Sequence, residues 1–304
     1  MKKFLLKLSL FGAIIILLLA GGEWAVRWLD NPYKTKDRWV RDHAPEIKTV
    51  ILGSSHTLFG VDPTLLGPGA VNLANISQTL RYDRLVLEHY LPMLDSLRNV
   101  VIQFGYTSLY DRNLEEGSEW HLAANYRLYM GLDRHSLLSH YGFELSDIDV
   151  YSGKLGVFLG LKDSQTLTAP SGQGLQYSLE NKNEDWFCES GPVIAQRHTS
   201  ELHPERRGEN ISEIERIDSL CRSKGARLII VTMPEWETYR SNVDVRLMDS
   251  AIATVDSLAR SRGITYLNFY EAEGFVPDDF YDADHLSSDV GARKLTLLLR
   301  PYLR

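Results

Sequence analysis

Residues 50–60 read VILGSSHTLFG, and this stretch decides how the rest of the chain is interpreted. The apolar residues at its start suit a buried strand, and they run directly into Gly53, Ser54, Ser55 and His56. A turn made of small residues would account for this composition. A serine nucleophile presented at the end of a strand would account for it as well, because a serine hydroxyl with a base nearby is a common catalytic arrangement. Other parts of the sequence have to decide between the two interpretations.

Short apolar segments like the one that leads into this turn recur along the chain. The five segments are residues 49–53, 70–74, 99–105, 226–232 and 264–270. They are continuous runs rich in Val, Ile and Leu, which is typical of strands that are covered on both faces. Between them lie helical patterns, for example over residues 79–97 and 244–262 and from Asn210 to Gly225. Strands that alternate with helices predict an α/β fold: a doubly wound, flavodoxin-like, five-stranded parallel sheet with helices on both faces.

One long segment interrupts this alternation after the third predicted strand. Residues 109–209 are rich in Tyr, Trp, His, Ser and Gly and show no strong period. A structureless loop of that length is improbable in a compact domain, so the segment is interpreted as an inserted subdomain or lid. Insertions at the carboxyl ends of parallel strands commonly shape a substrate site.

The N-terminus carries a membrane signal. An uncharged apolar run covers residues 8–22, and three lysines lie before it. Positive charge before an apolar segment predicts a cytoplasmic N-terminus and an extracytoplasmic domain. Small residues at 20–22 are typical of a signal-peptidase site, but we favour a transmembrane helix retained as an anchor within residues 1–29. Residues 30–46 are polar and mixed in charge, and we interpret them as a linker to an α/β domain over residues 47–304.

Composition excludes several classes of protein. The 304 residues are 44% hydrophobic, which is enough for a sizeable core. The net charge of -7 argues against a nucleic-acid partner, since such proteins are usually basic. Cys188 and Cys221 are too few for a disulfide scaffold and lack the spacing of a metal site. They are either free thiols or one disulfide bridge.

A second candidate motif lies near the C-terminus, where residues 280–292 read FYDADHLSSDVGA. Asp282 and His285 are three residues apart in a predicted turn before a helix. A carboxylate at that spacing can bind one imidazole nitrogen and fix its tautomer, which leaves the other nitrogen to act as a base. The alternatives are a helix cap or a surface turn, or a metal site to which Asp284 would contribute. Because the carboxyl ends of parallel strands meet at one crevice, this base and the serines can lie close together.

Taken together, these blocks resemble the SGNH (GDSL-type) hydrolase superfamily. The resemblance implies that Ser55 is the nucleophile, with Ser54 standing where the family has Asp, and that Asp282 and His285 complete a catalytic triad. In the family, a glycine after the second strand and an asparagine after the third help to build the oxyanion hole. The matching positions here are Ala74, whose N–H can donate, and Thr107, whose hydroxyl is shorter than an amide. The family requires no cofactor or metal.

The anchor and the substituted motif further resemble a membrane-bound branch of that superfamily. It includes the D-alanyl-transfer protein of teichoic acid synthesis and the alginate O-acetylation proteins, which act beside a multi-spanning membrane acyltransferase. The resemblance implies O-acyl transfer to a cell-envelope polysaccharide in the periplasm or at the cell surface. A carbohydrate esterase or deacetylase that uses the same triad is one alternative. A non-catalytic scaffold of an acylation complex is the other, and the Ala74 and Thr107 substitutions favour it.

Five further residues are weaker candidates for substrate binding. His56 either lines the site or belongs to the turn, and Asn75 is a substitute amide donor for the oxyanion. Tyr106 lies beside Thr107 at the end of the third strand. Arg197 and His198, in the insertion, are either ligands for an anionic or sugar substrate or an ordinary solvated pair.

Overall fold

The computed structural model describes residues 1–132, 142–163 and 167–303. Its strands are β1 (Thr49–Ile51), β2 (Ala70–Asn72), β3 (Asn99–Phe104), β4 (Arg227–Thr232) and β5 (Thr265–Asn268). They form one sheet in the order β2-β1-β3-β4-β5, and every neighbouring pair is parallel. The predicted doubly wound, five-stranded sheet is therefore confirmed, and each strand lies inside the segment predicted for it.

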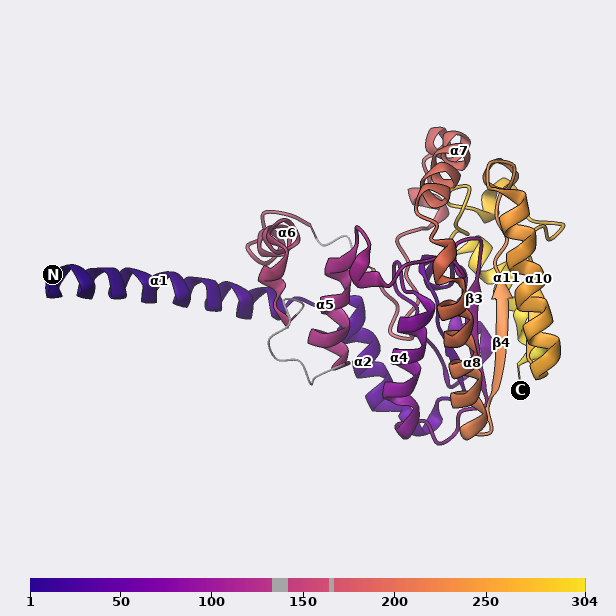
Figure 1. Ribbon diagram of the computed structural model, residues 1–304, viewed down its shortest axis with the longest axis horizontal. Helices are drawn as coiled ribbons and strands as arrows, with labels where there is room; N and C mark the ends of the chain where they lie inside the picture. Colours follow the sequence, from indigo (N-terminus) through magenta and orange to yellow (C-terminus); the bar gives the residue numbers. More distant parts are fainter. Residues whose placement is uncertain (133–141, 164–166, 304) are drawn as a thin grey trace.

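Helices cover both faces of this sheet (Figure 1). The α-helices of the described residues are α1 (Lys2–Arg27), α2 (Pro32–His43), α3 (Ser55–Gly60), α4 (Leu80–Tyr90), α5 (Ala123–Asn125), α6 (Ile148–Phe158), α7 (Glu184–Ser200), α8 (Arg207–Ser223), α9 (Glu237–Arg240), α10 (Val245–Arg262) and α11 (Val290–Leu299). Buried residues of α2, α4, α8 and α10 share one core with Val100 and Ile102 of β3. On the other face, Leu295 and Leu299 of α11 pack with Val101. Successive β3 residues thus point to opposite, equally covered faces, which explains their continuous apolar run.

The turn that the sequence singled out connects β1 to α3. Gly53 has a φ of 123°, a backbone conformation that strongly favours glycine. A Cβ at this position would lie 2.5 Å from Thr57 Oγ1 and 2.7 Å from Gln103 Cβ. Ser54 caps α3, and Ser55 is the first residue of the helix. The glycine therefore lets the chain reverse tightly enough to place Ser55 above the end of the sheet.

Residues 30–46 differ from the linker that we predicted, because α2 occupies most of them. Asn31 caps this helix by accepting a hydrogen bond from the Lys34 N–H at 3.0 Å. Its buried residues are Tyr33, Lys36 and Val40. Lys36 donates to Asn75 Oδ1 at 3.0 Å and also to the Ala74 carbonyl, and burial lowers its pKa to about 7. Because Lys36 lies in the middle of the buried face of α2, the apolar pattern of this helix is interrupted, and the sequence did not predict it.

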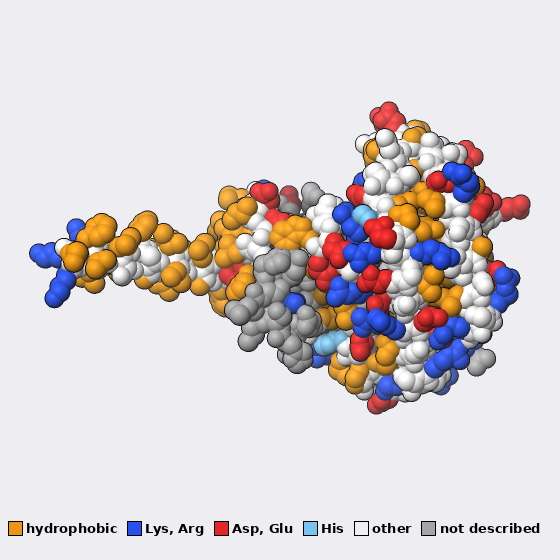
Figure 2. All heavy atoms as spheres, viewed as in Figure 1, with side chains coloured by type: hydrophobic (Ala, Val, Ile, Leu, Met, Phe, Trp, Pro, Cys, Tyr) orange, Lys and Arg blue, Asp and Glu red, His pale blue; other side chains and the backbone are white. Residues whose placement is uncertain are grey.

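The N-terminal helix α1 projects from the body of the protein (Figure 1). It is 26 residues long and apolar enough to cross a membrane, and the apolar part is not buried by the rest of the chain. Figure 2 shows hydrophobic side chains around this helix and basic ones at its tip. Its last turns are held by the insertion, because Glu23 accepts hydrogen bonds from the N–H groups of Glu144 and Leu145 at 2.9 and 3.1 Å.

The insertion lies between β3 and α8 and contains α5, α6 and α7. Part of the predicted range, residues 133–141 and 164–166, lies outside the described residues. Helix α8 begins at Arg207, three residues before Asn210, where the predicted helical pattern starts. The Asn210 side chain donates to the carbonyls of Leu109 and Asp111. Cys188 and Cys221 are free thiols, so the disulfide alternative is excluded.

Candidate active site

The structure brings the two sequence motifs together at the carboxyl ends of the strands. Ser55 Oγ lies 2.8 Å from His285 Nε2, although the two residues are 230 positions apart. His285 Nδ1 lies 3.0 Å from Asp282 Oδ1. Ser55 is partly buried, whereas His285 and Asp282 are buried. A hydroxyl, an imidazole and a carboxylate in this order can transfer a proton from the serine to the histidine during nucleophilic attack.

The loop before α11 fixes the histidine by means of its own backbone. Asp282 Oδ1 accepts the N–H of Asp284 at 3.0 Å and the N–H of His285 at 2.7 Å. The Tyr281 N–H donates to the His285 carbonyl at 2.9 Å, and Phe280 pairs with Leu286 across the loop. A carboxylate held in this way keeps the proton of a neutral imidazole on Nδ1. Nε2 is then free to accept the serine proton.

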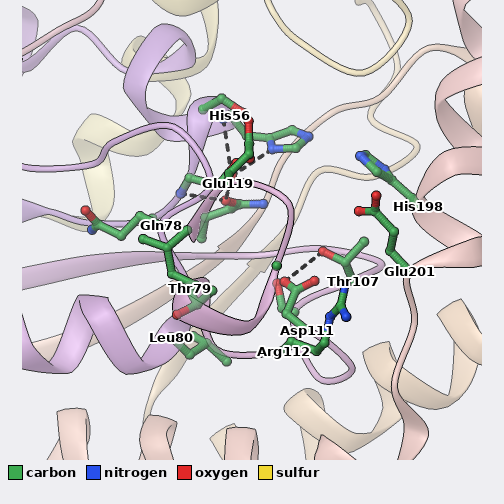
Figure 3. A pocket seen from close by; sticks show the side chains of 18 of the residues that line it. His56, Gln78, Thr79, Leu80, Thr107, Asp111, Arg112, Glu119, His198 and Glu201 are labelled. Carbon is green, nitrogen blue, oxygen red and sulfur yellow. Dashed lines mark hydrogen bonds between the residues drawn. The ribbon is translucent and has the colours of Figure 1, made fainter. Parts of the chain in front are cut away.

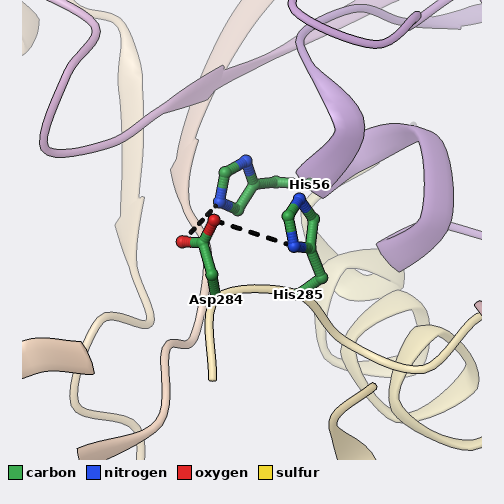
Figure 4. A group of neighbouring side chains, drawn as sticks. All are labelled: His56, Asp284 and His285. Carbon is green, nitrogen blue, oxygen red and sulfur yellow. Dashed lines mark hydrogen bonds and ion pairs between the residues drawn. The ribbon is translucent and has the colours of Figure 1, made fainter. Parts of the chain in front are cut away.

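A second histidine and a second carboxylate lie directly beside His285 (Figure 4). His56 Nε2 is 3.0 Å from Asp284 Oδ1, and His56 Nδ1 is 2.9 Å from Ser54 Oγ. The rings of His56 and His285 stack with their centroids 4.6 Å apart. Sequence reasoning left His56 undecided between turn and site, and it considered Asp284 only as a cap or metal ligand. The structure places both residues in contact with His285.

These groups also include a possible set of metal ligands. Ligand atoms of His56, Asp284 and His285 lie within 4.8 Å of one another, and two imidazoles with a carboxylate suit zinc or iron. However, His285 already contacts Asp282 through Nδ1 and Ser55 through Nε2. A metal ion on His285 would have to displace one of these two contacts. The hydrogen-bond network therefore fits acid–base chemistry better than metal binding.

The triad opens into a polar cleft of about 200 Å³. Figure 3 shows Gln78, Thr79 and Leu80 on one side, and His198 and Glu201 of the insertion on the other. Residues 107–108 and 111–114, which follow β3, form a further part of the lining. Charged side chains of both signs and small polar residues dominate this cleft. Such a lining suits a hydroxylated substrate better than a long hydrocarbon chain.

The two predicted oxyanion donors are not available in the structure. The Ala74 N–H donates to Asn72 Oδ1 at 3.0 Å, and Ala74 is fully buried away from the cleft lining. Thr107 lines the cleft, but its hydroxyl donates to Asp111 Oδ2 at 3.0 Å. In the turn after β2, the first residue that lines the cleft is Ser77, which has a φ of 53°. The turn after β2 thus reaches the cleft three residues later than the predicted position Ala74.

Two of the weaker substrate candidates also lie outside the cleft lining. Asn75 is buried, and its side-chain amide donates to the Leu73 carbonyl and to Gln78 Oε1. Tyr106 is buried, and its hydroxyl accepts the N–H of Asp244 at 3.1 Å. Both side chains hold neighbouring segments in place, so their predicted roles in substrate binding are not supported.

Arg197 and His198 do line the cleft, at the end of α7. Arg197 is exposed, whereas the His198 ring is within 2.7 Å of the Tyr239 hydroxyl through Nδ1. Burial lowers the pKa of His198 to about 4, so this ring is neutral at physiological pH. The pair therefore offers one cation and one neutral hydrogen-bonding group to a ligand.

Two residues that hold the turn at Gly53 and Ser54 were not predicted from the sequence. Gln103 Oε1 accepts the N–H of Ser54 at 3.1 Å and lies 2.5 Å from Ser54 Oγ. Asp83 accepts hydrogen bonds from the Gly53 backbone and from Gln78 Nε2, and burial raises its pKa to about 7. A glutamine within the apolar strand NVVIQF was the available signal for Gln103.

Among known proteins, the chain shows similarity only to solved structures. No model of a protein family matches the chain, and no curated protein matches it. It is similar to a GDSL-like lipase from Bacteroides thetaiotaomicron (12% identity, TM-score 0.42), covering 89% of this chain and 100% of the other. It is also similar to a protein provisionally described as an acylhydrolase, from Bacteroides fragilis (14%, TM-score 0.40, covering 90% and 96%), and to a carbohydrate acetylesterase family member from Sinorhizobium meliloti (13%, TM-score 0.37, covering 84% and 97%). A function for this chain has to be inferred from its own side chains.

Proposed function

We propose that the protein is an SGNH-like serine acyl-transfer enzyme with Ser55 as nucleophile, His285 as general base and Asp282 as the group that orients the base. The observation that carries the proposal is the 2.8 Å contact between Ser55 Oγ and His285 Nε2, with Asp282 on the other imidazole nitrogen. A serine hydroxyl is a poor nucleophile until a base accepts its proton, and this geometry supplies that base.

The reaction proceeds in two halves. Ser55 Oγ bonds to the carbonyl carbon of an ester while its proton passes to His285 Nε2. The bond to the departing alcohol then breaks, and the alcohol oxygen takes that proton from His285. In the second half, an acceptor hydroxyl gives its proton to His285 and attacks the acyl-Ser55 ester, and Ser55 recovers the proton. Asp282 stabilises the imidazolium that forms in each half.

Backbone groups of the turns after β1 and β2 are the proposed oxyanion donors. Ser55 and Ser77 both line the cleft. Neither of their N–H groups is used in a hydrogen bond to another described residue. The left-handed backbone of Ser77 turns the chain at the cleft. We assign the oxyanion to these two N–H groups, in place of the predicted donors Ala74 and Thr107.

The proposed acyl acceptor is a hydroxyl of a cell-envelope polysaccharide, outside the cytoplasm. The polar cleft supports a sugar substrate. The apolar, unburied α1 supports a membrane anchor and thus an envelope substrate. A multi-spanning membrane acyltransferase is the proposed partner, because an acyl group would have to be delivered across the bilayer. Water in place of the sugar would make the same site an esterase or deacetylase.

The proposal is tested by labelling the full-length, detergent-solubilised protein with a fluorophosphonate and mapping the adduct. We expect the adduct on Ser55, because His285 activates only this hydroxyl. Ser54→Ala is the matched control, and it should still be labelled. An unlabelled wild-type protein would favour the non-catalytic scaffold. If the probe labels the wild type, incubation with an acetyl ester and an oligosaccharide, followed by mass spectrometry, separates transfer to the sugar from release of acetate.

A chelator should leave the labelling rate unchanged. Both nitrogens of His285 are engaged, by Ser55 and by Asp282, so the proposed chemistry needs no metal ion. The measurement compares fluorophosphonate labelling before and after dialysis against EDTA. Loss of labelling that is restored by zinc would instead assign His56, Asp284 and His285 as metal ligands.

A further inference from the structure

Two hydrogen-bonded chains lie side by side in the cleft, and the proposed mechanism uses only one of them. The first runs from Ser55 through His285 to Asp282. The second runs from Ser54 through His56 to Asp284. The two imidazole rings stack at 4.6 Å with an interplanar angle of 23° (Figure 4). The second chain therefore lies against the first at the residue that has to act as the base.

The hydrogen bonds of Ser54 decide the protonation of His56 Nδ1. The Ser54 N–H donates to Gln103 Oε1 at 3.1 Å, which identifies this atom as the amide oxygen, an acceptor. Ser54 Oγ lies 2.5 Å from the same oxygen, so the hydroxyl must direct its only proton there. At its 2.9 Å contact with His56 Nδ1, Ser54 Oγ is consequently the acceptor. His56 Nδ1 must carry a proton.

The other nitrogen of His56 carries a proton as well. Nε2 lies 3.0 Å from Asp284 Oδ1, and an ionised carboxylate can only accept. Burial opposes the ionisation of Asp284, but the adjacent histidines hold its pKa below the usual range. Burial likewise tends to lower the pKa of His56, yet the Asp284 carboxylate raises it overall. Both directions agree with an imidazolium paired with a carboxylate.

We propose that His56 is a fixed imidazolium that offsets the charge of Asp284, so that His285 remains neutral and able to act as a base. His285 needs this protection because it lies between two carboxylates. Asp282 contacts its Nδ1 at 3.0 Å, and Asp284 Oδ2 lies 3.7 Å from the same nitrogen. Two uncompensated negative charges would favour the protonated ring, which cannot accept the serine proton. The inference rests on the proposed function, in which His285 is the general base.

Three titratable groups around this pair carry no positive charge near neutral pH. Glu235, which follows β4, is buried, and burial together with Asp284 raises its pKa well above the usual value. His198 of α7 is neutral because burial lowers its pKa to about 4. Burial raises the pKa of Tyr177 to about 12. These groups add no charge that would replace the one on His56.

The charged groups nearby are mostly acidic. Burial raises the pKa of Asp111, which follows β3, to about 6, so this carboxylate is ionised above that pH. Asp282 faces His56 from the loop before α11. Two arginines of the insertion, Arg112 and Arg197, line the cleft. Arg112 is partly buried, and Arg197 is exposed to solvent, which screens its charge. His56 is thus the buried cation that contacts Asp284 directly.

Replacing His56 by glutamine tests the role of its charge. His56→Gln keeps polar ends but leaves the charge of Asp284 uncompensated, which favours the protonated ring of His285. Activity requires that His285 has lost this proton, so the acid limb of the rate–pH profile should move to higher pH by about one unit or more. The double variant His56→Gln/Asp284→Asn removes both charges and should return the limb close to that of the wild type. A purely packing role for His56 would lower the rate without moving the limb.

A second variant and a direct measurement complete the test. Gln103→Leu removes the acceptor of the Ser54 proton, so Ser54 can donate to His56 and the acid limb should again move to higher pH. This variant serves where His56→Gln does not fold. Nitrogen NMR of the full-length protein with labelled histidines should show both His56 nitrogens protonated near neutral pH. A neutral His56 would overturn the inference. This spectrum does not depend on turnover, so an inactive wild type would refute the proposed function alone.

Discussion

Ser55→Ala is expected to lower the rate of ester turnover by a factor on the order of 10⁴ or more, because the acyl-enzyme bond is formed by the Ser55 hydroxyl. The contact of Ser55 Oγ with His285 Nε2 is the direct hydrogen bond between the proposed nucleophile and the base. Stability should hardly change, since the side chain is small and partly exposed. The measurement is the hydrolysis of p-nitrophenyl acetate, with the melting temperature as a check on folding.

Ser54→Ala is the control for this prediction, because the two serines are adjacent and equal in size. In the wild type, the Ser54 hydroxyl contacts Gln103 and His56 rather than His285. We expect it to retain acyl-enzyme formation, with a change in pH dependence through His56. Inactive Ser54→Ala together with active Ser55→Ala would show that the assigned nucleophile is wrong by one residue.

Asp282→Asn is expected to have the second largest effect, a loss of about 10⁴ in kcat, as for other serine triads in which the orienting acid becomes an amide. Asp282 Oδ1 accepts two backbone N–H groups, so the oxygen of an asparagine would remain on the backbone. Its NH₂ group would then take the place of Oδ2, which lies 3.2 Å from His285 Nδ1, and would favour the imidazole tautomer with its proton on Nε2. In that tautomer, His285 cannot accept the proton of Ser55. The measurement is kcat across the pH range.

Asp284→Asn is the matched comparison, because the same substitution is made two residues away on the same loop. Asp284 contacts His56 at 3.0 Å, whereas its approach to His285 is longer, at 3.7 Å. We expect a much smaller loss in kcat than for Asp282→Asn. Equal losses in both variants, or a larger one in Asp284→Asn, would mean that Asp284 rather than Asp282 orients the base.

The sheet was predictable because its signals are local and repeated. β3 and β4 are apolar runs between helices, and residues of both faces are buried, so their pattern needed no tertiary information. The contact of Ser55 with His285 was predictable for a related reason, since parallel strands bring their carboxyl ends to one edge. The sequence positions of the two motifs were therefore enough to predict a site at that edge.

The remaining parts of the site depend on backbone paths and buried polar contacts. Ala74 and Ser77 are three residues apart in one turn, and only the actual φ of Ser77 shows which residue reaches the cleft. Thr107 was the expected donor, but its partner Asp111 lies four residues further along a loop with no periodicity. The protonation of His56 depends on Gln103, which is 47 positions distant in sequence and on another strand. Such contacts leave no spacing signal.

The attachment of α1 to the insertion has a consequence for how a substrate is found. Glu23 accepts hydrogen bonds from two backbone N–H groups just before α6, and Arg27 pairs with Glu23. Tyr151 packs against Gly22 so closely that a Cβ on Gly22 would lie 1.9 Å from the tyrosine hydroxyl. These contacts prevent α1 from rotating freely relative to the insertion. In the proposed anchored protein, the cleft would keep one height and one direction relative to the bilayer. The polymer chain, rather than the enzyme, would then have to supply the motion that brings successive hydroxyls to Ser55.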